Sequence, residues 1–126
     1  MILGLGIDLV EVERIHRSLE RFPERFLARI LRPAEIAYCR QYKQPAERVA
    51  GHFAAKEAVS KAFGTGISSA LGWHDMEIIH QASGEPGLVL HDAGQLLARQ
   101  KNVRRVLVSI SHTAHHATAV AILEGD

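Results

Sequence analysis

The sequence VAGHFAAKEAVSKAFGTGI, residues 49–67, decides the fold. Alanine dominates it, and most other positions hold residues that favour helices, so it predicts one long helix. Three alanines recur at a spacing of four, namely Ala54, Ala58 and Ala62. That side of the helix is thin, so a neighbouring element can pack closely against it. Gly64 stands where a left-handed cap would end the helix, and Gly66 keeps the next loop tight.

Two charged residues lie on one face of this predicted helix. Glu57 and Lys61 are four residues apart, and Phe53 lies one turn earlier on the same face. One explanation is an ordinary surface ion pair, which contributes only about 0.2–0.5 kcal/mol to a helix. The other is a rigid acid and amine that hold a metal ion and a phosphate beside an apolar wall. The spacing alone does not decide between them.

Length and composition predict one globular domain spanning residues 1–126. The chain is 47% hydrophobic and 23% charged, which is enough apolar surface for a core of its own. A domain of this size has little room for a deep enclosed pocket, which favours a site shared between subunits. The formal net charge is only +1, so we expect no nucleic-acid partner.

The sequence also predicts a cytoplasmic location and no membrane partner. Cys39 is the only cysteine, so no disulfide can form within the chain. No apolar run approaches the length of a membrane span. The N-terminus lacks the basic region that precedes the apolar run of a secretory signal.

The N-terminal apolar run, residues 1–7, predicts a buried strand. Gly4 and Gly6 are followed by no third glycine at dinucleotide-binding spacing, which excludes a Rossmann motif. Asp8 follows the run directly. With Glu11 three residues later, Asp8 fits the capping box of a helix, and as a carboxylate at a strand end it could instead reach a shared metal.

Six arginines follow at helical spacing: Arg14, Arg17, Arg21, Arg25, Arg29 and Arg32. Pro23 predicts a break between two helices or a kink within this stretch. The arginines fit a solvated face with internal salt bridges, or a docking surface for an acidic partner helix, because guanidinium groups match carboxylates in geometry.

The remaining pattern predicts an α+β fold, with an antiparallel sheet and the long helix packed across it. A short helix is expected over 33–42, a polar connector over 43–48, strands over 76–80 and 88–90 around a turn at 83–87, a helix over 93–101, and an antiparallel hairpin of strands 106–110 and 117–123.

The turn of this hairpin is rich in histidine. His112, His115 and His116 suggest a transition metal, but no cysteine is near and alternation sends the last two to opposite faces. Hydroxyls and imidazoles at a strand end can instead hydrogen-bond a phosphate or a base of a ligand.

Four motifs, in this order, resemble the holo-acyl-carrier-protein synthases, the small single-copy class of 4′-phosphopantetheinyl transferases. They are GIDLVEVERI at 6–15, FAAKEAVSKAFGTGI at 53–67, GEP at 84–86 and VSISHT at 108–113. The resemblance covers essentially the whole chain, and the second motif is the most specific.

This resemblance implies the phosphopantetheinyl transferase fold and a homotrimer with sites at its subunit interfaces. It implies Mg²⁺-dependent transfer of the phosphopantetheine arm from coenzyme A to a serine of apo acyl carrier protein. Adenosine 3′,5′-bisphosphate would leave, and the product would support fatty acid synthesis. On the residues alone, a non-enzymatic binding module and a metal-dependent phosphohydrolase stay open as alternatives.

The resemblance also implies roles for individual residues. Asp8 and Glu57 would bind Mg²⁺ and form the catalytic set with Lys61, which contacts the diphosphate of coenzyme A. The other expected coenzyme A contacts are Phe53, Gly64, Thr65, Gly66, Pro86, Ser111, His112 and Thr113. The expected carrier-protein docking residues are Arg14, Arg21 and Arg25. The group that deprotonates the serine is left open between Glu57 and a water held by the metal.

The chain departs from the family pattern at three positions. Pro23 interrupts the basic helix, so the direction of Arg25 is left open. His52 stands where arginine is usual, so any positive charge there depends on pH. Glu85 stands where lysine is frequent, which removes one expected contact to the nucleotide.

Overall fold

The computed structural model describes residues 1–126 and has two antiparallel sheets and five α-helices. In chain order the elements are β1 (Ile2–Glu11), α1 (Val12–Arg21), α2 (Pro23–Ile30), α3 (Pro33–Arg40), α4 (Pro45–Phe63), the short 3₁₀ turn η1 (Trp73–Asp75), β2 (Met76–His80), β3 (Pro86–Leu90), α5 (Ala93–Gln100), β4 (Val103–His112) and β5 (His116–Gly125).

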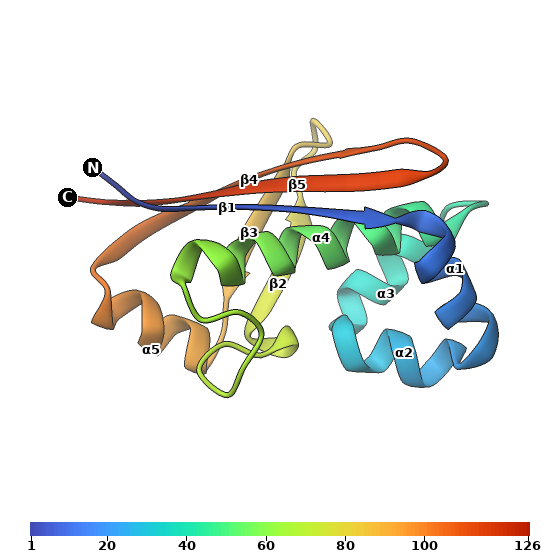
Figure 1. Cartoon of the computed structure of the whole chain (residues 1–126), viewed down its shortest axis with the longest axis horizontal. Helices are drawn as coiled ribbons and strands as arrows, with labels where there is room; N and C mark the ends of the chain where they lie inside the picture. The colour runs from blue at the N-terminus through green and yellow to red at the C-terminus, as the bar shows by residue number, and fades with distance from the viewer.

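The long helix α4 lies along one face of the three-stranded sheet β1-β5-β4 (Figure 1). Helices α1, α2 and α3 gather at one end of α4, and α5 lies toward the other end. The second sheet is the hairpin β2-β3, which crosses α4. The predicted α+β class is therefore confirmed, although the sequence did not indicate that the strands divide into two sheets. No helix is both long enough and apolar enough to cross a membrane.

Helix α4 is longer than its sequence pattern predicted. It begins at Pro45, in a segment that we expected to be a polar connector. Proline suits this position because the first turn of a helix needs no backbone N–H donor. The predicted end is confirmed, since Gly64 caps the helix in the left-handed conformation with φ of 81°.

Strand β1 is also longer than predicted, and this changes the position of Asp8. The strand runs to Glu11, so Asp8 lies within it and pairs in register with Ala119 of β5. The capping-box interpretation of Asp8 is wrong, because α1 starts only at Val12 and its N-cap, Glu11, makes no side-chain capping bond. Pairing with β5 keeps the backbone extended past the apolar run.

The glycines of β1 let this strand lie almost in contact with the backbone of α4. A Cβ atom on Gly6 would lie 1.9 Å from the carbonyl oxygen of Ala58, and one on Gly4 would lie 2.3 Å from that of Ala62. The thin alanine side of the helix therefore faces β1, which confirms that a neighbouring element packs closely against it. Glycine on the strand and alanine on the helix together set the distance between the two elements.

The opposite face of this sheet is apolar and uncovered. Leu5, Ile7 and Leu9 of β1 are 66%, 61% and 66% exposed. Ile122 and Val120 of β5 lie beside Leu5 and Ile7 in register, and Leu107 of β4 lies on the other side of Ile122. We call these six side chains the outer sheet face. A contiguous apolar patch of this kind marks an interaction surface.

We expect Gly6→Ala to lower the free energy of unfolding by about 3 kcal/mol or more, because the obstacle is a backbone oxygen that cannot rotate away. Gly87→Ala in β3 is the matched control, since its Cβ would meet only side-chain atoms, of Ile79 at 3.3 Å and of Gln81 at 3.8 Å. Urea denaturation followed by circular dichroism measures both. Equal effects of the two variants would contradict this account of β1 packing.

Candidate active site

Lys61 joins helix α4 to strand β1. Its Nζ donates hydrogen bonds to Oδ1 of Asp8 at 3.0 Å and to the carbonyl oxygen of Ile7 at 3.0 Å. Lys61 thus pairs with an acid on another element. The simple surface-pair explanation required it to pair with Glu57. Its side chain is still 50% exposed, so the ammonium group remains accessible to a ligand.

Glu57 lies close enough to Asp8 for the two carboxylates to repel. Burial, followed by the negative charge of Asp8, raises the pKa of the Glu57 carboxyl, against the opposing effects of Lys61 and Arg14. No group in the chain donates a hydrogen bond to this carboxylate. The Glu57 carboxylate therefore lies beside a second carboxylate and accepts no hydrogen bond, and a divalent cation with oxygen ligands fits such a pair.

Arg14 of α1 lies beside the same face of α4. Its guanidinium carbon lies 5.6 Å from the centre of the Phe53 ring, and that ring packs against Trp73 with centroids 5.0 Å apart. Phe53 is buried, and the Arg14 guanidinium lies over its ring. The structure therefore brings together Asp8, Glu57, Lys61, Phe53 and Arg14, which we call the carboxylate cluster.

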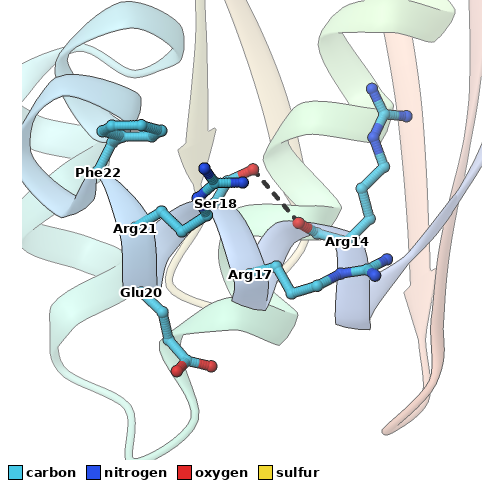
Figure 2. A pocket seen from close by; sticks show the side chains of 6 residues that line it. All are labelled: Arg14, Arg17, Ser18, Glu20, Arg21 and Phe22. Carbon is cyan, nitrogen blue, oxygen red and sulfur yellow. Dashed lines mark hydrogen bonds between the residues drawn. The ribbon is translucent and has the colours of Figure 1, made fainter.

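A groove along α1 leads away from this cluster. Figure 2 shows the side chains that line it, which are Arg14, Arg17, Ser18, Glu20, Arg21 and Phe22. Arg14 reaches from the groove toward α4, whereas Arg21 lies near Phe22 at the end of α1.

The break at Pro23 is confirmed, and it rearranges the predicted arginine stripe. Phe22 is 48% exposed at this break, with the guanidinium groups of Arg21 and Arg25 at 5.5 Å and 5.9 Å from its ring centre. Arg32 turns away and donates a hydrogen bond to the carbonyl of His74 at 2.7 Å. The six arginines therefore do not form one continuous face.

A second cavity, of about 120 Å³, opens on the other side of α4. Its lining residues are Tyr38, Arg48, Gly51, His52, His80, Gly84, Pro86, Ile110 and His112, and we call it the histidine pocket. Two of the expected coenzyme A contacts, Pro86 and His112, lie in it.

The other expected coenzyme A contacts lie elsewhere in the chain. Gly64, Thr65 and Gly66 follow the far end of α4. Ser111 precedes His112 in β4 and so points to the opposite face of the sheet, where it is exposed. Thr113 lies in the hairpin turn, and its Oγ1 accepts hydrogen bonds from the amides of His115 and His116. These residues do not form one pocket within a single chain.

The histidines of the hairpin turn do not converge. No group of three or more histidine, cysteine, aspartate or glutamate side chains lies close enough together to hold a metal ion. Asp8 and Glu57 therefore stay the Mg²⁺ ligands that the resemblance predicts.

Comparison with known proteins identifies the family. The family model for the 4′-phosphopantetheinyl transferase superfamily matches residues 4–121. The chain belongs to this superfamily. A holo-[acyl-carrier-protein] synthase of Koribacter versatilis is 48% identical over 98% of this chain and 99% of its own length.

Solved structures of this superfamily have the same fold. The crystal structure of holo-[acyl-carrier-protein] synthase from Neisseria meningitidis superposes with a TM-score of 0.91 at 35% identity, covering 98% of this chain and 99% of the other. The Helicobacter pylori synthase in complex with coenzyme A superposes with a TM-score of 0.86 at 35% identity, covering 95% and 99%. The enzyme class and the fold that the sequence predicted are therefore confirmed.

This phosphopantetheinyl transferase also contains a buried charge cluster that the sequence analysis missed. Lys56 is fully buried, and its Nζ donates to Oε1 of Glu35 at 2.7 Å, to the carbonyl of Ile30 at 2.7 Å and to that of Trp73 at 3.1 Å. The second oxygen of Glu35 bonds to Nδ1 of His52 at 2.9 Å. The cluster fixes α3 and η1 against the centre of α4.

The two charges hold each other ionised in the core. Burial raises the pKa of Glu35, but the hydrogen bond from His52 and the charge of Lys56 more than offset this, so the pKa is lowered. Burial lowers the pKa of Lys56, and Glu35 opposes that shift. The signal available in the sequence was Lys56 itself, a lysine beside the alanines of α4. Its partner Glu35 lies 21 residues earlier, in another helix, so the local pattern did not indicate the pair.

We expect Lys56→Met to lower the free energy of unfolding by about 3–5 kcal/mol, because it leaves the Glu35 carboxylate buried without its cation. Lys61→Met, at a half-exposed lysine, should change it by about 1 kcal/mol or less. The double variant Lys56→Met/Glu35→Gln should recover part of the loss. Urea denaturation measures all three, and a small cost for Lys56→Met would refute the role of this cluster.

Proposed function

We propose that this chain transfers the 4′-phosphopantetheine arm of coenzyme A to a serine of an apo acyl carrier protein and releases adenosine 3′,5′-bisphosphate. The observation that carries this proposal is the carboxylate cluster, in which Asp8, Glu57 and Lys61 meet beside Arg14. Its residues come from two motifs that resemble the holo-acyl-carrier-protein synthases. The names of the relatives and the coenzyme A complex of the Helicobacter pylori enzyme support the same reaction.

The carboxylate cluster suits phosphoryl transfer to a hydroxyl, which depends on positioning and on neutralising charge. Asp8 and Glu57 would hold Mg²⁺, because their mutual repulsion and the raised pKa of Glu57 are relieved by a cation. When bound, Mg²⁺ would neutralise the diphosphate of coenzyme A. Lys61 would contact the same diphosphate and offset the negative charge that develops on the leaving oxygen.

The groove along α1 would position the carrier protein. Arg14 joins the groove to the carboxylate cluster, so an acidic helix bound along α1 would bring its serine toward Glu57. Arg21 and Arg25, on either side of the break at Pro23, would extend this contact around the exposed Phe22 ring.

A homotrimer would complete the site. The outer sheet face is a continuous apolar surface that a second copy of the chain could cover. Ser111 lies on this side of the sheet, away from His112. Contacts between copies would therefore bring expected coenzyme A residues of one subunit toward the carboxylate cluster of another. A role in fatty acid synthesis and a cytoplasmic location remain predictions from the sequence.

The Glu57→Gln variant tests the metal assignment. We expect it to lose transfer activity by at least about 100-fold. We also expect Mg²⁺ to raise the melting temperature of the wild-type protein and to leave that of the variant unchanged. Its fold should be intact, because the helix keeps its shape. The assay incubates protein, coenzyme A and Mg²⁺ with and without apo carrier protein, and mass spectrometry detects the modified carrier.

The same assay separates the rival functions. Release of the bisphosphate only when carrier protein is present supports the transferase. Release without carrier protein would indicate a phosphohydrolase, and no release at all would indicate a binding module. Normal turnover by Glu57→Gln at ordinary Mg²⁺ concentration would overturn the metal assignment.

The Arg14→Glu variant tests whether the groove along α1 docks the carrier protein. Reversing this charge should raise KM for the carrier protein by about tenfold or more and change KM for coenzyme A by less than about twofold. Arg29→Glu is the matched control, because Arg29 is an exposed arginine of α2 outside the groove. Equal effects of Arg14→Glu on both substrates would count against docking.

The Ile7→Lys variant tests the subunit interface. A charge at the centre of the outer sheet face should convert the trimer to monomers and abolish activity, because a lysine there cannot be buried without a partner. Ile79→Lys is the control, since Ile79 is 38% exposed on the other sheet. Size-exclusion chromatography with light scattering gives the mass. A wild-type protein that is monomeric at micromolar concentration would exclude the proposed assembly.

A further inference from the structure

The histidine pocket presents nitrogen donors and no acid. Arg48, His52, His80 and His112 line it, and none of its other lining residues carries a carboxylate. The Arg48 guanidinium contacts Nε2 of His112, and Nδ1 of His112 is buried without a hydrogen-bond partner. A small cavity with this lining attracts an anion, such as a phosphate group.

His52 and His80 face each other across this pocket through a single hydrogen bond. Nε2 of His52 lies 3.0 Å from Nε2 of His80, and a distance this short has room for one proton between the two nitrogens. Nδ1 of His52 lies 2.9 Å from the ionised Glu35 and so carries a proton of its own. The one remaining position that can gain or lose a proton is Nδ1 of His80.

The surroundings of His80 disfavour its charged form. Burial and the charges of His52 and Arg48 lower the pKa of His80, while the backbone of Gly84 and the charge of Glu35 raise it by less. The Tyr38 ring stacks on the His80 ring with centroids 3.9 Å apart and fixes its plane. Other titratable groups on this side are His112 of β4, which contacts Arg48 and lies 3.8 Å from the Glu47 carboxylate, and Lys56 of α4, which bonds to Glu35. The Tyr42 ring lies under Arg48, 4.0 Å from its guanidinium carbon.

We infer that the His52–His80 pair takes up a proton when a phosphate group enters the histidine pocket, so that the affinity for the nucleotide half of coenzyme A falls as pH rises. This inference rests on the proposed function for the identity of the ligand. An anion in the pocket favours the charged form of the pair, and by linkage the charged form favours the anion.

Binding of the bisphosphate should be accompanied by a measurable uptake of protons by the protein. Adenosine 3′,5′-bisphosphate is titrated calorimetrically into the whole protein at pH 7 in two phosphate-free buffers of different ionisation enthalpy. Wild-type protein should take up at least about half a proton more than His80→Gln, and its dissociation constant should rise by up to about tenfold per pH unit above pH 7. The comparison with His80→Gln removes the titration of the ligand's own phosphates from the result.

Two further variants complete the test. His80→Lys places a lasting charge in the pocket, so its binding should need little proton uptake and weaken less as pH rises. His91→Gln is the matched control, because His91 bonds to Glu77 at 2.8 Å outside the pocket and should behave as wild type. Inorganic phosphate serves as a second probe, and proton uptake with it shows that the phosphate group alone is the trigger.

The possible failures are distinct. Bisphosphate binding with equal proton uptake by wild type and His80→Gln would overturn the inference and leave the proposed function standing. Should His80→Gln not fold, a wild-type dissociation constant that stays constant between pH 6 and pH 8 would overturn the inference as well. Failure of the wild-type protein to bind either bisphosphate or coenzyme A would reject the proposed function itself.

Discussion

The close approach of strand β1 to helix α4 is the constraint on which the rest of the structure depends. The strand passes so near the helix that the positions of Gly4 and Gly6 have no room for a Cβ atom. This contact continues along β1 to Asp8, which the strand carries to the ammonium group of Lys61. A carboxylate pair therefore forms from two segments about 50 residues apart, and both of its acids are held on rigid backbone.

The neighbouring sides of helix α4 have different contacts and different roles. The alanine side sets the distance to β1, the side of Glu57 and Lys61 bears the carboxylate cluster, and Lys56 is directed into the core toward Glu35. Lys56 and Glu57 are adjacent in sequence but about 100° apart around the helix, so one charge is buried for stability while the other stays accessible. The buried cluster also holds His52, and through it the geometry of the histidine pocket.

Local signals in the sequence predicted the local features correctly. Gly64 predicted the end of α4, Pro23 predicted the break after α1, and alternation predicted the β4-β5 hairpin, because each depends on a few adjacent residues. One error is local, because α4 begins at Pro45 within the predicted connector, and the others concern pairing over long distances. Strand β1 continues past Ile7 because β5 pairs with it, and Lys61 bonds to Asp8 because the two elements touch. The burial of Lys56 depends on a partner in another helix, and the expected coenzyme A contacts, although matched by sequence motifs, do not come together within one chain.

The position of Trp73 gives the protein a built-in optical reporter. It is the only tryptophan in the chain, its ring packs on Phe53 beneath Arg14, and its carbonyl accepts a hydrogen bond from Lys56. Indole emission responds to the polarity and motion of its surroundings, so loosening of the buried charge cluster and displacement of Arg14 would both alter the fluorescence. Events on two sides of α4 can thus be followed in the unlabelled protein by stopped-flow spectroscopy.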